Sequence, residues 1–491
     1  MLWRKLINPS ADTALSSGGL TLSYKELLIA IEARMAWLES HVTGSLAIDM
    51  SNGIEWILFD LAALAADIPV VPIPSFFTDK QRDYVLRQAG VGLIVTDKPT
   101  VMTDATEFLA IYFQRLKHTV IKLPRETAKI TYTSGSTGQS KGVCLSTQTM
   151  IATARAISAA VNIEKPVHMN LLPLPTLLEN VAGVYAPLMN GGAVYAPSNE
   201  SLGFVGSRLL DARKLLQQIS AYQPDSLIVV PELLMVLVSA CSKGWIPPKS
   251  LQFIAVGGAR VTPALLAQAS RAGLPVFQGY GLSECGSVVA LNRSINNKLG
   301  SIGQILDHVD CFIEDGELMI KGNNFLGYLG DESSWYPTVV ATEDLVSEDN
   351  EQFLWFEGRR KNQLISSFGR NICPEWPESE LLSGGTIQQA VVFGDSKPHC
   401  IAIISPFPST TKQQLLATLN AVNLELPDYA QIKQVLVLDA PMTSECGLFT
   451  DNGRPNRKQI LTTFSSEIEA LYDCDDVLTQ FKMSHLLEPC S

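Results

Sequence analysis

A segment rich in glycine and hydroxyl side chains lies between residues 129 and 143 and reads KITYTSGSTGQSKGV. Glycine lets the backbone approach a ligand closely, because it carries no side chain and tolerates positive φ. Hydroxyls and successive backbone N–H groups can surround an anion, and a lysine adds a full positive charge. The segment therefore predicts a polyphosphate-binding loop. Its expected ligand contacts are Thr133, Ser134, Gly135, Ser136, Thr137, Gly138 and Lys141.

The spacing in this loop differs from the common nucleotide-binding patterns. In GxxxxGK[ST], a glycine precedes the lysine and a hydroxyl residue follows it. Here Ser140 precedes Lys141 and Gly142 follows it. The dinucleotide pattern GxGxxG is also absent from the loop. A flexible surface loop of serine and glycine is the alternative that composition alone favours.

A second segment that could do chemistry, residues 278–284 (QGYGLSE), follows strand-like residues 275–277. Ligands of open α/β sheets bind beyond the carboxyl ends of strands. We expect Tyr280 to offer a flat face to a purine, Ser283 a hydroxyl to a phosphate and Glu284 an oxygen ligand to Mg²⁺. A plain turn before a helix is the alternative. The other expected nucleotide contacts of this segment are Gln278, Gly279 and Gly281.

These segments resemble the motifs of a known family. The order YTSGSTGxxKG is similar to the signature of the adenylate-forming ligases, the acyl-CoA synthetase and luciferase superfamily. Residues 278–284 are similar to the family's YGxTE motif, with Ser283 in place of threonine. The resemblance implies that ATP binds here and that Thr137 and Glu284 hold Mg²⁺. It also implies that a glycine turn lies against the adenine, namely Gly257, Gly258 and Ala259.

Residues 342–361 carry further motifs in the family's order. Asp344 stands where the family's TGD has a ribose-binding aspartate, but Glu343 replaces the glycine. Arg359 resembles the arginine of the family's GR motif, which reaches the ribose or phosphate, and Lys361 occupies the pivot position between domains. A solvated basic patch is the alternative interpretation of these cations.

The largest departure from the family lies at residues 452–457, NGRPNR, which align with NGKxxR. The resemblance places Arg454 where the catalytic lysine bridges the substrate carboxylate and the α-phosphate. Arginine keeps the charge and can bind both groups, but its planar guanidinium is not equivalent to the point charge of lysine. Another match concerns a loop of the small domain that lines the thiol channel, for which an ordinary turn is the alternative. That loop includes Gly369, Arg370 and Asn371.

Two other segments resemble the family less specifically. Residues 172–181 (LPLPTLLENV) resemble the acyl-site motif of long-chain acyl-CoA synthetases, although Thr176 stands where an aromatic residue or histidine is usual. The apolar residues there suit an aliphatic tail or, equally, a core helix, and Glu179 is a candidate ligand of Mg²⁺ or of the loop. Residues 316–328 (GELMIKGNNFLGY) resemble a structural stretch that we expect to shape the domain rather than react.

The elements that must position these residues alternate between helices and apolar strands up to about residue 290. We expect helices at about 24–38, with Ser23 as a candidate cap, and at 54–66, 147–161 and 232–241. Such alternation predicts an α/β fold of layered, mostly parallel sheets covered by helices on both faces. Short strands between residues 300 and 360 add a β-rich part. We expect an AMP-binding domain at 1–360 and a small, mobile α+β domain at 361–491.

Length and composition limit the classes of function. At 491 residues, the chain is too long for one compact core. A net charge of −12 argues against a nucleic-acid partner and against an anionic membrane surface. Nine cysteines without CxxC pairs indicate a reducing compartment rather than a disulfide framework. Without an expected signal or membrane-spanning segment, a cytoplasmic enzyme is the default expectation.

Taken together, the resemblance implies an acid–thiol ligase. It implies ATP-dependent activation of a fatty or other apolar carboxylic acid to acyl-AMP, then transfer to the thiol of CoA. An alternative acceptor is the phosphopantetheine of an acyl carrier protein. Because Arg454, Glu343 and Thr176 depart from the family pattern, a nucleotide-binding pseudoenzyme is an alternative of a different class.

Overall fold

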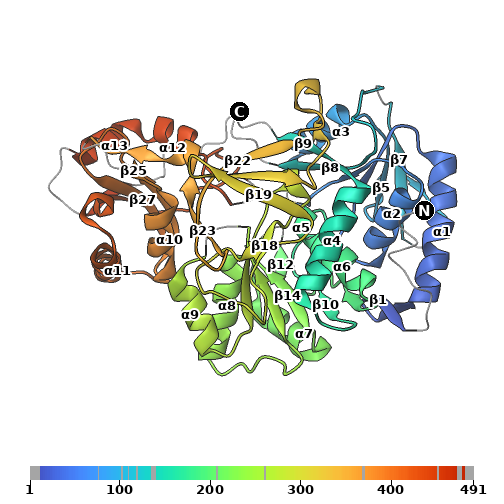
Figure 1. The fold of residues 1–491 in the computed structure, drawn as a ribbon, viewed down its shortest axis with the longest axis horizontal. Coiled ribbons are helices and arrows are strands. Elements are labelled where there is room, and N and C mark those ends of the chain that lie inside the picture. Colours follow the sequence, from blue (N-terminus) through green and yellow to red (C-terminus); the bar gives the residue numbers. More distant parts are fainter. Residues whose placement is uncertain are drawn as a thin grey trace.

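The computed structural model describes most of the chain. The N-terminal part, coloured from blue to yellow, and the C-terminal part, in orange and red, lie side by side (Figure 1). The described residues are 12–75, 77–100, 103–108, 110–117, 120–133, 140–205, 208–258, 261–367, 371–450, 453–472 and 478–481.

The first large sheet has eight strands in the order β21-β9-β8-β4-β3-β5-β7-β6. Its centre is parallel, since β3 (Ser45–Asp49) pairs in parallel with β4 (Val70–Pro72) and β5 (Val91–Thr96). Every residue of these strands is buried, as expected for a parallel sheet covered on both faces. Antiparallel pairs at both ends make the sheet mixed. The remaining strands are β6 (Asp104–Ala105), β7 (Tyr112–Arg115), β8 (Thr127–Thr133), β9 (Lys141–Ser146) and β21 (Gly327–Tyr328).

The second large sheet has nine strands in the order β18-β17-β16-β15-β14-β10-β11-β1-β2. Its run from β16 to β1 is parallel, and antiparallel strands close both edges. The carboxyl ends of β15 and β16 therefore lie at the same edge of the sheet. The strands are β1 (Thr13–Ser17), β2 (Leu20–Ser23), β10 (Val167–Met169), β11 (Ala193–Tyr195), β14 (Ser226–Val229), β15 (Phe253–Val256), β16 (Val276–Tyr280), β17 (Ala290–Leu291) and β18 (Gln304–Ile305). A separate hairpin joins β12 (Phe204–Val205) to β13 (Arg208–Leu209).

The expected helices are confirmed. Ser23 caps the first of them through a reciprocal pair of hydrogen bonds with Glu26. The expected helices are α1 (Tyr24–His41), α2 (Ile54–Ala65), α4 (Thr147–Val161) and α8 (Pro231–Ser242). The other helices of this domain are α3 (Asp79–Gln88), α5 (Leu177–Asn180), α6 (Ala186–Met189), α7 (Ala212–Tyr222) and α9 (Pro263–Arg271).

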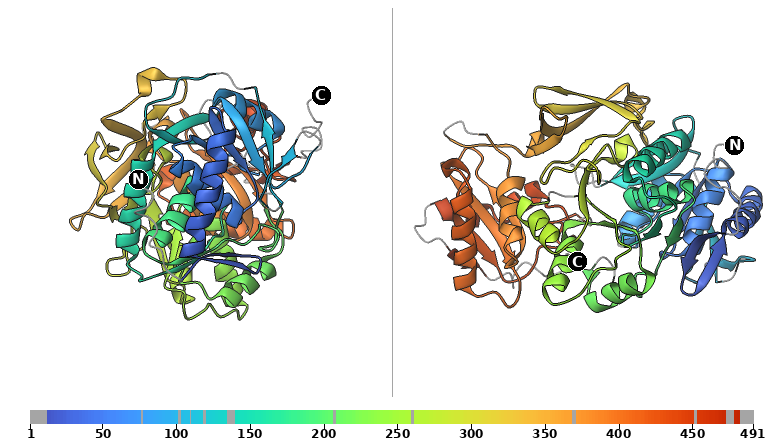
Figure 2. Two further views of the ribbon diagram at one scale, coloured as in Figure 1. Left: turned by 90° about the vertical axis from the view of Figure 1, so that its right-hand side faces the viewer. Right: turned by 60° about the horizontal axis from the view of Figure 1, so that its bottom comes forward.

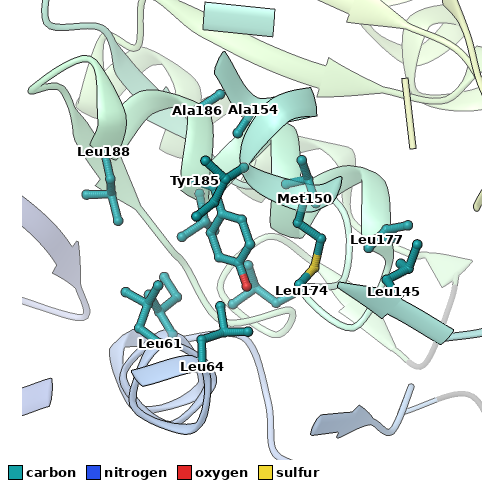
Figure 3. Packing of buried hydrophobic residues seen from close by; sticks show 14 of the residues in the cluster. Leu61, Leu64, Leu145, Met150, Ala154, Leu174, Leu177, Tyr185, Ala186 and Leu188 are labelled. Atoms are coloured by element: carbon teal, nitrogen blue, oxygen red, sulfur yellow. The ribbon is translucent and has the colours of Figure 1, made fainter. Parts of the chain in front are cut away.

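The main hydrophobic core lies where α2, α4 and the segment around Tyr185 meet. A single π-helical turn, Val181–Tyr185, joins α5 to α6. Figure 3 shows the ring of Tyr185 among apolar side chains, with its hydroxyl directed toward the helix that carries Leu61 and Leu64. This core fixes the acyl-site segment between the two large sheets.

The β-rich part is an antiparallel sheet in the order β19-β20-β22-β23. Asp315 and Gly316 form the turn between the first two of these strands, and both adopt positive φ, 48° and 79°. The strands are β19 (Val309–Glu314), β20 (Glu317–Gly322), β22 (Val339–Glu348) and β23 (Leu354–Arg359).

The C-terminal domain is built on another mixed sheet, in the order β26-β27-β28-β29, and lies beside the large domain in the right-hand view of Figure 2. Both faces of this sheet are buried: Val392 packs into one apolar cluster and its neighbour Val391 into another. Its elements are β24 (Leu364–Ile365), β25 (Asn371–Ile372), α10 (Glu375–Ser383), β26 (Ile387–Phe393), β27 (Cys400–Pro406), α11 (Lys412–Glu425), β28 (Ile432–Leu438), α12 (Arg457–Thr463), α13 (Ser465–Tyr472) and β29 (Leu478–Phe481).

The expected fold class is confirmed: α/β layers form a large N-terminal domain, and an α+β domain follows it. The domain boundary at residue 360 and the mobility of the second domain stay predictions. None of the helices in the described part of the chain is both long enough and apolar enough to cross a membrane.

Candidate active site

The predicted purine and ribose contacts meet at the end of β16. The hydroxyl of Tyr280 donates a hydrogen bond to Oδ2 of Asp344 at 2.7 Å. Arg359 lies opposite Asp344 in the register of β22 and β23, and its Nε is 3.0 Å from Oδ1. Two sheets that are distant in sequence thus contribute to one cluster.

Burial dominates the electrostatics of this cluster. The carboxylate of Asp344 is only 4% exposed. Burial raises its pKa, and the adjacent Arg359 guanidinium, the Tyr280 hydroxyl and Arg454 act in the opposite direction. Burial and the nearby Asp344 also hold the pKa of Tyr280 well above its ordinary value. The phenol therefore stays protonated and can donate to the carboxylate at neutral pH.

Arg454 reaches this cluster from the C-terminal domain. It lies in the turn between β28 and α12, and its Nη2 donates to the carbonyl oxygen of Gly258 at 3.3 Å. Burial around the guanidinium lowers the pKa of Arg454, as does Arg359, whereas Asp344 and Glu284 raise it. Arg454 nevertheless stays exposed to solvent, including at its contact with Gly258. The sequence-predicted cation of the second domain is therefore brought to the strand ends of the first.

Lys141 and Glu284 are connected by a residue that sequence reasoning did not select, Tyr328. The Tyr328 hydroxyl donates to Oε1 of Glu284 at 2.9 Å, and Nζ of Lys141 lies 4.8 Å from the centre of the Tyr328 ring. From the sequence, residues 316–328 are expected to shape the domain rather than react. The available signal was the tyrosine itself, which ends a stretch that resembles a family motif.

Glu343 occupies the position of a family glycine and keeps a glycine-like backbone. Its φ is 59°, in the left-handed region. Its N–H donates to Oε1 of Glu317 at 2.8 Å, and its Oε2 pairs with Nζ of Lys361 at 2.6 Å. The neighbouring Arg360 pairs with Oε2 of the same Glu317 at 3.1 Å. Arg360 and Lys361 are thus ion-paired with the β-rich sheet while their side chains stay partly exposed.

The glycines at the strand ends are required by close approach. A Cβ on Gly281 would lie 1.7 Å from the carbonyl oxygen of Ser287, and Gly258 has a φ of 83°. Gly257 comes close to Gly279, since an added Cβ would lie 3.1 Å from its carbonyl oxygen. Ser283 opens a short 3₁₀ helix, Ser283–Cys285. Gln278, which precedes Gly279, is buried.

Several predicted site residues lie outside the described residues, so their predicted roles are untested. Thr133 ends β8 and Lys141 begins β9, and the two are paired across the predicted phosphate loop. Asn371 is described only as part of the short strand β25. The predicted residues outside the described part are Ser134, Gly135, Ser136, Thr137, Gly138, Ala259, Gly369 and Arg370.

The acyl-site segment is held by buried polar side chains. Glu179 is fully buried, accepts a hydrogen bond from Nδ2 of Asn170 at 2.7 Å and lies 3.4 Å from Nε2 of His168. This burial does not support the expected role of Glu179 as a Mg²⁺ ligand. A Cβ on Gly183 of the π-helical turn would lie within 3 Å of all three side chains, so the turn packs directly on them. The polar cluster therefore positions the turn.

The adjacent Asn180 enters a second buried cluster. Nζ of Lys129 pairs with Oδ1 of Asp60 at 2.7 Å and donates to the hydroxyl of Tyr185 at 3.0 Å. Nδ2 of Asn180 donates to Oδ2 of Asp60 at 3.0 Å. Burial lowers the pKa of Lys129, and the Asp60 carboxylate opposes that effect. The cluster ties α2 and β8 to the acyl-site segment.

An apolar cavity of about 60 Å³ lies beside the π-helical turn. It runs between α4, this turn and the strands β14 and β15. Leu291 in its wall pairs with Gly279, and Ala255 lies two residues before Gly257, so the cavity is directly behind the glycine turns. Among its lining residues are Ile157, Val161, Leu178, Ala182, Ala255 and Leu291.

The residues present fit a nucleotide-bound Mg²⁺ rather than a protein-only metal site. No group of three His, Cys, Asp or Glu side chains within the described ranges could hold a metal ion. Mg²⁺ at nucleotide sites is usually bound by one or two carboxylates together with phosphates and water. Half-buried Glu284, with one oxygen bonded to Tyr328, fits such a ligand.

Comparisons with known families agree with this arrangement. The model of the AMP-binding enzyme family matches residues 3–329, and that of the AMP-binding enzyme C-terminal domain matches residues 361–476. The chain therefore belongs to the AMP-binding enzyme family, within the adenylate-forming ligase superfamily.

Its curated relatives include proteins named as CoA ligases. The chain is 30% identical over 236 residues to the long-chain-fatty-acid–CoA ligase FadD15 of Mycobacterium bovis. This alignment covers 41% of the chain and only 39% of that ligase. It is 27% identical over 422 residues to the 2-succinylbenzoate–CoA ligase of Bacillus subtilis, covering 78% of this chain and 83% of the relative. Both relatives carry the names of acid–CoA ligases, and the chain spans about two fifths of the length of the first of them.

Solved structures share the fold. The O-succinylbenzoate coenzyme A synthetase of Bacillus subtilis in complex with AMP superposes with a TM-score of 0.74 at 24% identity, covering 94% of this chain and 97% of that one. The anthranilate CoA ligase AuaEII in complex with anthranoyl-AMP gives a TM-score of 0.77 at 15% identity, covering 94% and 96%.

Proposed function

We propose that this chain activates a carboxylic acid with ATP to an acyl-adenylate and transfers the acyl group to the thiol of CoA. The observation that carries the proposal is the position of Arg454. From the second domain, its guanidinium contacts Gly258 and faces Asp344 and Glu284 at the strand ends. A nucleotide there would be enclosed by cations and hydrogen-bonding groups from both domains.

The chemistry explains why a nucleotide is needed. A carboxylate is a poor acceptor for a thiol, because its leaving group would be oxide or hydroxide. When a carboxylate oxygen attacks the α-phosphorus of ATP, pyrophosphate leaves and AMP becomes the leaving group for the thiol. Preorganised cations lower the barrier by stabilising charge that develops on the transferring phosphoryl group. Bound Mg²⁺ would neutralise further charge on the phosphates.

The proposal assigns a role to each of the main residues of the site. Asp344, held by Tyr280 and Arg359, accepts hydrogen bonds from the ribose hydroxyls. Tyr280 presents its ring to the purine. Lys141, with Thr133 and the loop between them, binds the terminal phosphates. Arg454 bridges the substrate carboxylate and the α-phosphate, which its forked donors permit.

Thioester formation requires the second domain to turn, so that Arg454 leaves and the loop at residues 369–371 approaches. In this proposal Lys361 is the pivot. Its ion pair with Glu343 joins the pivot to the β-rich sheet, so the turn must break or stretch that pair. The thiol then attacks the acyl carbon, and AMP is released.

We further propose that the acyl group is compact rather than a long fatty chain. The cavity behind the glycine turns, about 60 Å³, is smaller than the roughly 150 Å³ cavity that holds benzene in an engineered protein. A space of this size does not hold an aromatic ring, so it argues against a long aliphatic chain behind the glycine turns and does not itself favour an aromatic acid. The proposal of a compact acid is supported separately by the relatives named for 2-succinylbenzoate, and it differs from the long-chain acid that the acyl-site motif suggested.

An ATP–pyrophosphate exchange assay over a panel of acids tests the proposal. The panel should contain 2-succinylbenzoate, other aromatic acids, and short, medium and long fatty acids. We expect exchange with compact acids and little with long chains. ATP binding without exchange for every acid would contradict the ligase and favour the pseudoenzyme.

A second assay identifies the acceptor. The acid that supports exchange is supplied with CoA or with a phosphopantetheine-bearing carrier protein, and thioester formation is measured. We expect thioester with CoA. If thioester forms only on the carrier protein, the carrier protein and not CoA is the acceptor. The proposed first half-reaction, formation of the acyl-adenylate, would still stand.

A further inference from the structure

Tyr328 occupies a place that the fold creates between two motifs. It belongs to β21 (Gly327–Tyr328), which pairs antiparallel with β9 and places Tyr328 opposite Val143. Since β9 begins at Lys141, the pairing places Tyr328 beside the end of the predicted phosphate loop. The same tyrosine reaches Glu284, which follows a strand of the other large sheet.

Surrounding residues hold Tyr328 in one orientation. Its N–H donates to Oγ of Ser334 at 2.8 Å, and its carbonyl oxygen accepts from Nε1 of Trp335 at 3.0 Å. Phe325 packs edge-on against the ring, with centroids 4.9 Å apart. A ring restrained in this way can define the positions of the charges that it contacts.

The contacts of Tyr328 keep two opposite charges apart. Its hydroxyl donates to Oε1 of Glu284 at 2.9 Å, while Nζ of Lys141 lies over its ring at 4.8 Å. Among the described residues, no ion pair joins Lys141 to Glu284. If Lys141 and Glu284 formed an ion pair, Lys141 would be less available to bind a phosphate. Glu284 would likewise be less available to bind a cation.

The hydrogen bond from Tyr328 occupies only one side of the Glu284 carboxylate. The hydroxyl donates to Oε1. One donated hydrogen bond leaves the second carboxylate oxygen of Glu284 available for a cation, because an ionised carboxylate has several acceptor sites.

We propose that Tyr328 is a positioning residue that separates Lys141 from Glu284 and orients both toward a Mg²⁺-nucleotide. The inference rests on the proposed function only in assuming that a Mg²⁺-nucleotide is the ligand. Tyr328 does not touch the reacting atoms. It acts through Glu284 by a hydrogen bond and through Lys141 by a cation–π contact.

Two substitutions separate these contacts. Tyr328→Phe removes the hydroxyl and keeps the ring, whereas Tyr328→Leu removes both. Nucleotide binding is measured by titration calorimetry with ATP at a series of Mg²⁺ concentrations and without any acid, so the readout is independent of turnover. Tyr336→Phe is the matched control, because the hydroxyl of Tyr336 accepts from the N–H of Arg125 and contacts neither charged group.

For Tyr328→Phe we expect the Mg²⁺ concentration at half-saturation to rise by about tenfold, the effect of losing a hydrogen bond to a charged group. Binding of ATP without Mg²⁺ should stay unchanged. Tyr328→Leu should also weaken metal-free ATP binding by about two- to fivefold, through loss of the cation–π contact. Tyr336→Phe should match the wild-type protein in both measurements.

An unchanged Mg²⁺ midpoint in a folded Tyr328→Phe protein would overturn the inference, and so would an equal shift in Tyr336→Phe. Should Tyr328→Leu not fold, the phenylalanine variant alone decides. If Tyr328→Phe shows the expected Mg²⁺ shift but the wild-type protein shows no pyrophosphate exchange with any acid, the proposed function is contradicted and the role of Tyr328 is supported. A wild-type protein that binds no ATP would overturn both.

Discussion

Glu343 offers a test of how this chain tolerates a side chain where the family has glycine. The substitution Glu343→Gly restores the family residue. It relieves the left-handed backbone at φ 59°, which costs a non-glycine residue roughly 1–2 kcal/mol. Against this gain, glycine increases the entropy of the unfolded chain and costs roughly 0.5–1 kcal/mol.

The ion pair with Lys361 adds a smaller contribution. The side chains of Glu343 and Lys361 are 54% and 38% exposed, so the pair at 2.6 Å contributes about 0.2–1 kcal/mol after solvent screening. We therefore expect Glu343→Gly to change the free energy of unfolding by less than about 1 kcal/mol. Glu343→Gln keeps the strained backbone and removes only the charge, so it should destabilise by about 0.2–1 kcal/mol.

The same ion pair predicts an effect on the two half-reactions. If it forms only in the present arrangement of the domains, removing it favours the turned arrangement by at most about fivefold. Both variants should then raise the rate of acyl transfer to CoA relative to pyrophosphate exchange. High ionic strength should reproduce the effect in the wild-type protein and have little effect on the variants, because salt screens exposed pairs.

The assays are urea unfolding for stability, and pyrophosphate exchange and thioester formation at low and high ionic strength. Glu332→Gln is a control, because Glu332 forms an exposed ion pair with Lys122 and contacts neither hinge residue. A loss of more than about 2 kcal/mol in Glu343→Gly would refute the strain argument. Identical ratios of the half-reactions in all variants would refute the coupling to Lys361.

Other substitutions test the site and its support. Arg454→Lys should retain or raise pyrophosphate exchange, and a large loss would show that the guanidinium is specifically fitted to its substrate. Asp60→Asn should cost about 3–5 kcal/mol in urea unfolding at neutral pH, because it leaves Lys129 charged and unpaired in the core. Burial already lowers the pKa of Lys129, and the variant removes the carboxylate that opposes this effect. Below pH 10.5 the unfolded variant therefore binds more protons than the folded one, so its stability should rise as the pH rises toward 10.5. A stability that does not change with pH would contradict this. Burial raises the pKa of Glu378 from 4.5 to about 7, although Arg457 opposes this effect. Between pH 4.5 and 7 the folded protein therefore binds more protons than the unfolded chain, and the contribution of Glu378 to stability falls as the pH rises through this range. Glu378→Gln should abolish this slope in unfolding measured from pH 4.5 to 7, and an unaltered slope would exclude Glu378 as its source.

Local patterns predicted much of the fold. The helix at Tyr24–His41 follows from Ser23 and Glu26, which cap it through contacts only a few residues apart. The parallel strand Ser45–Asp49 follows from the apolar run at residues 46–48. In both cases the determining interactions are local in sequence, so a single sequence contains the information.

The candidate site was predictable where a motif combined glycines with charged groups. Tyr280 and Asp344 were expected at the nucleotide, and the structure joins them by a hydrogen bond. Tyr328 was missed, because its partner Glu284 is remote in sequence and the residue occurs in a stretch interpreted as structural. Glu179 was given a metal-binding role, because the sequence does not reveal that His168 and Asn170 surround it.

By itself, the sequence of this chain determined the α/β class, the order of the motifs and the positions of the strand-end glycines, since each depends on short-range backbone geometry and hydrophobic pattern. Only the tertiary structure decided that Arg454 meets Gly258 across the domains, that Glu343 pairs with Lys361, and how little room lies behind the glycine turns. These features depend on how separate sheets pack against each other. Such packing is set by the sum of many distant contacts, and no single segment contains it.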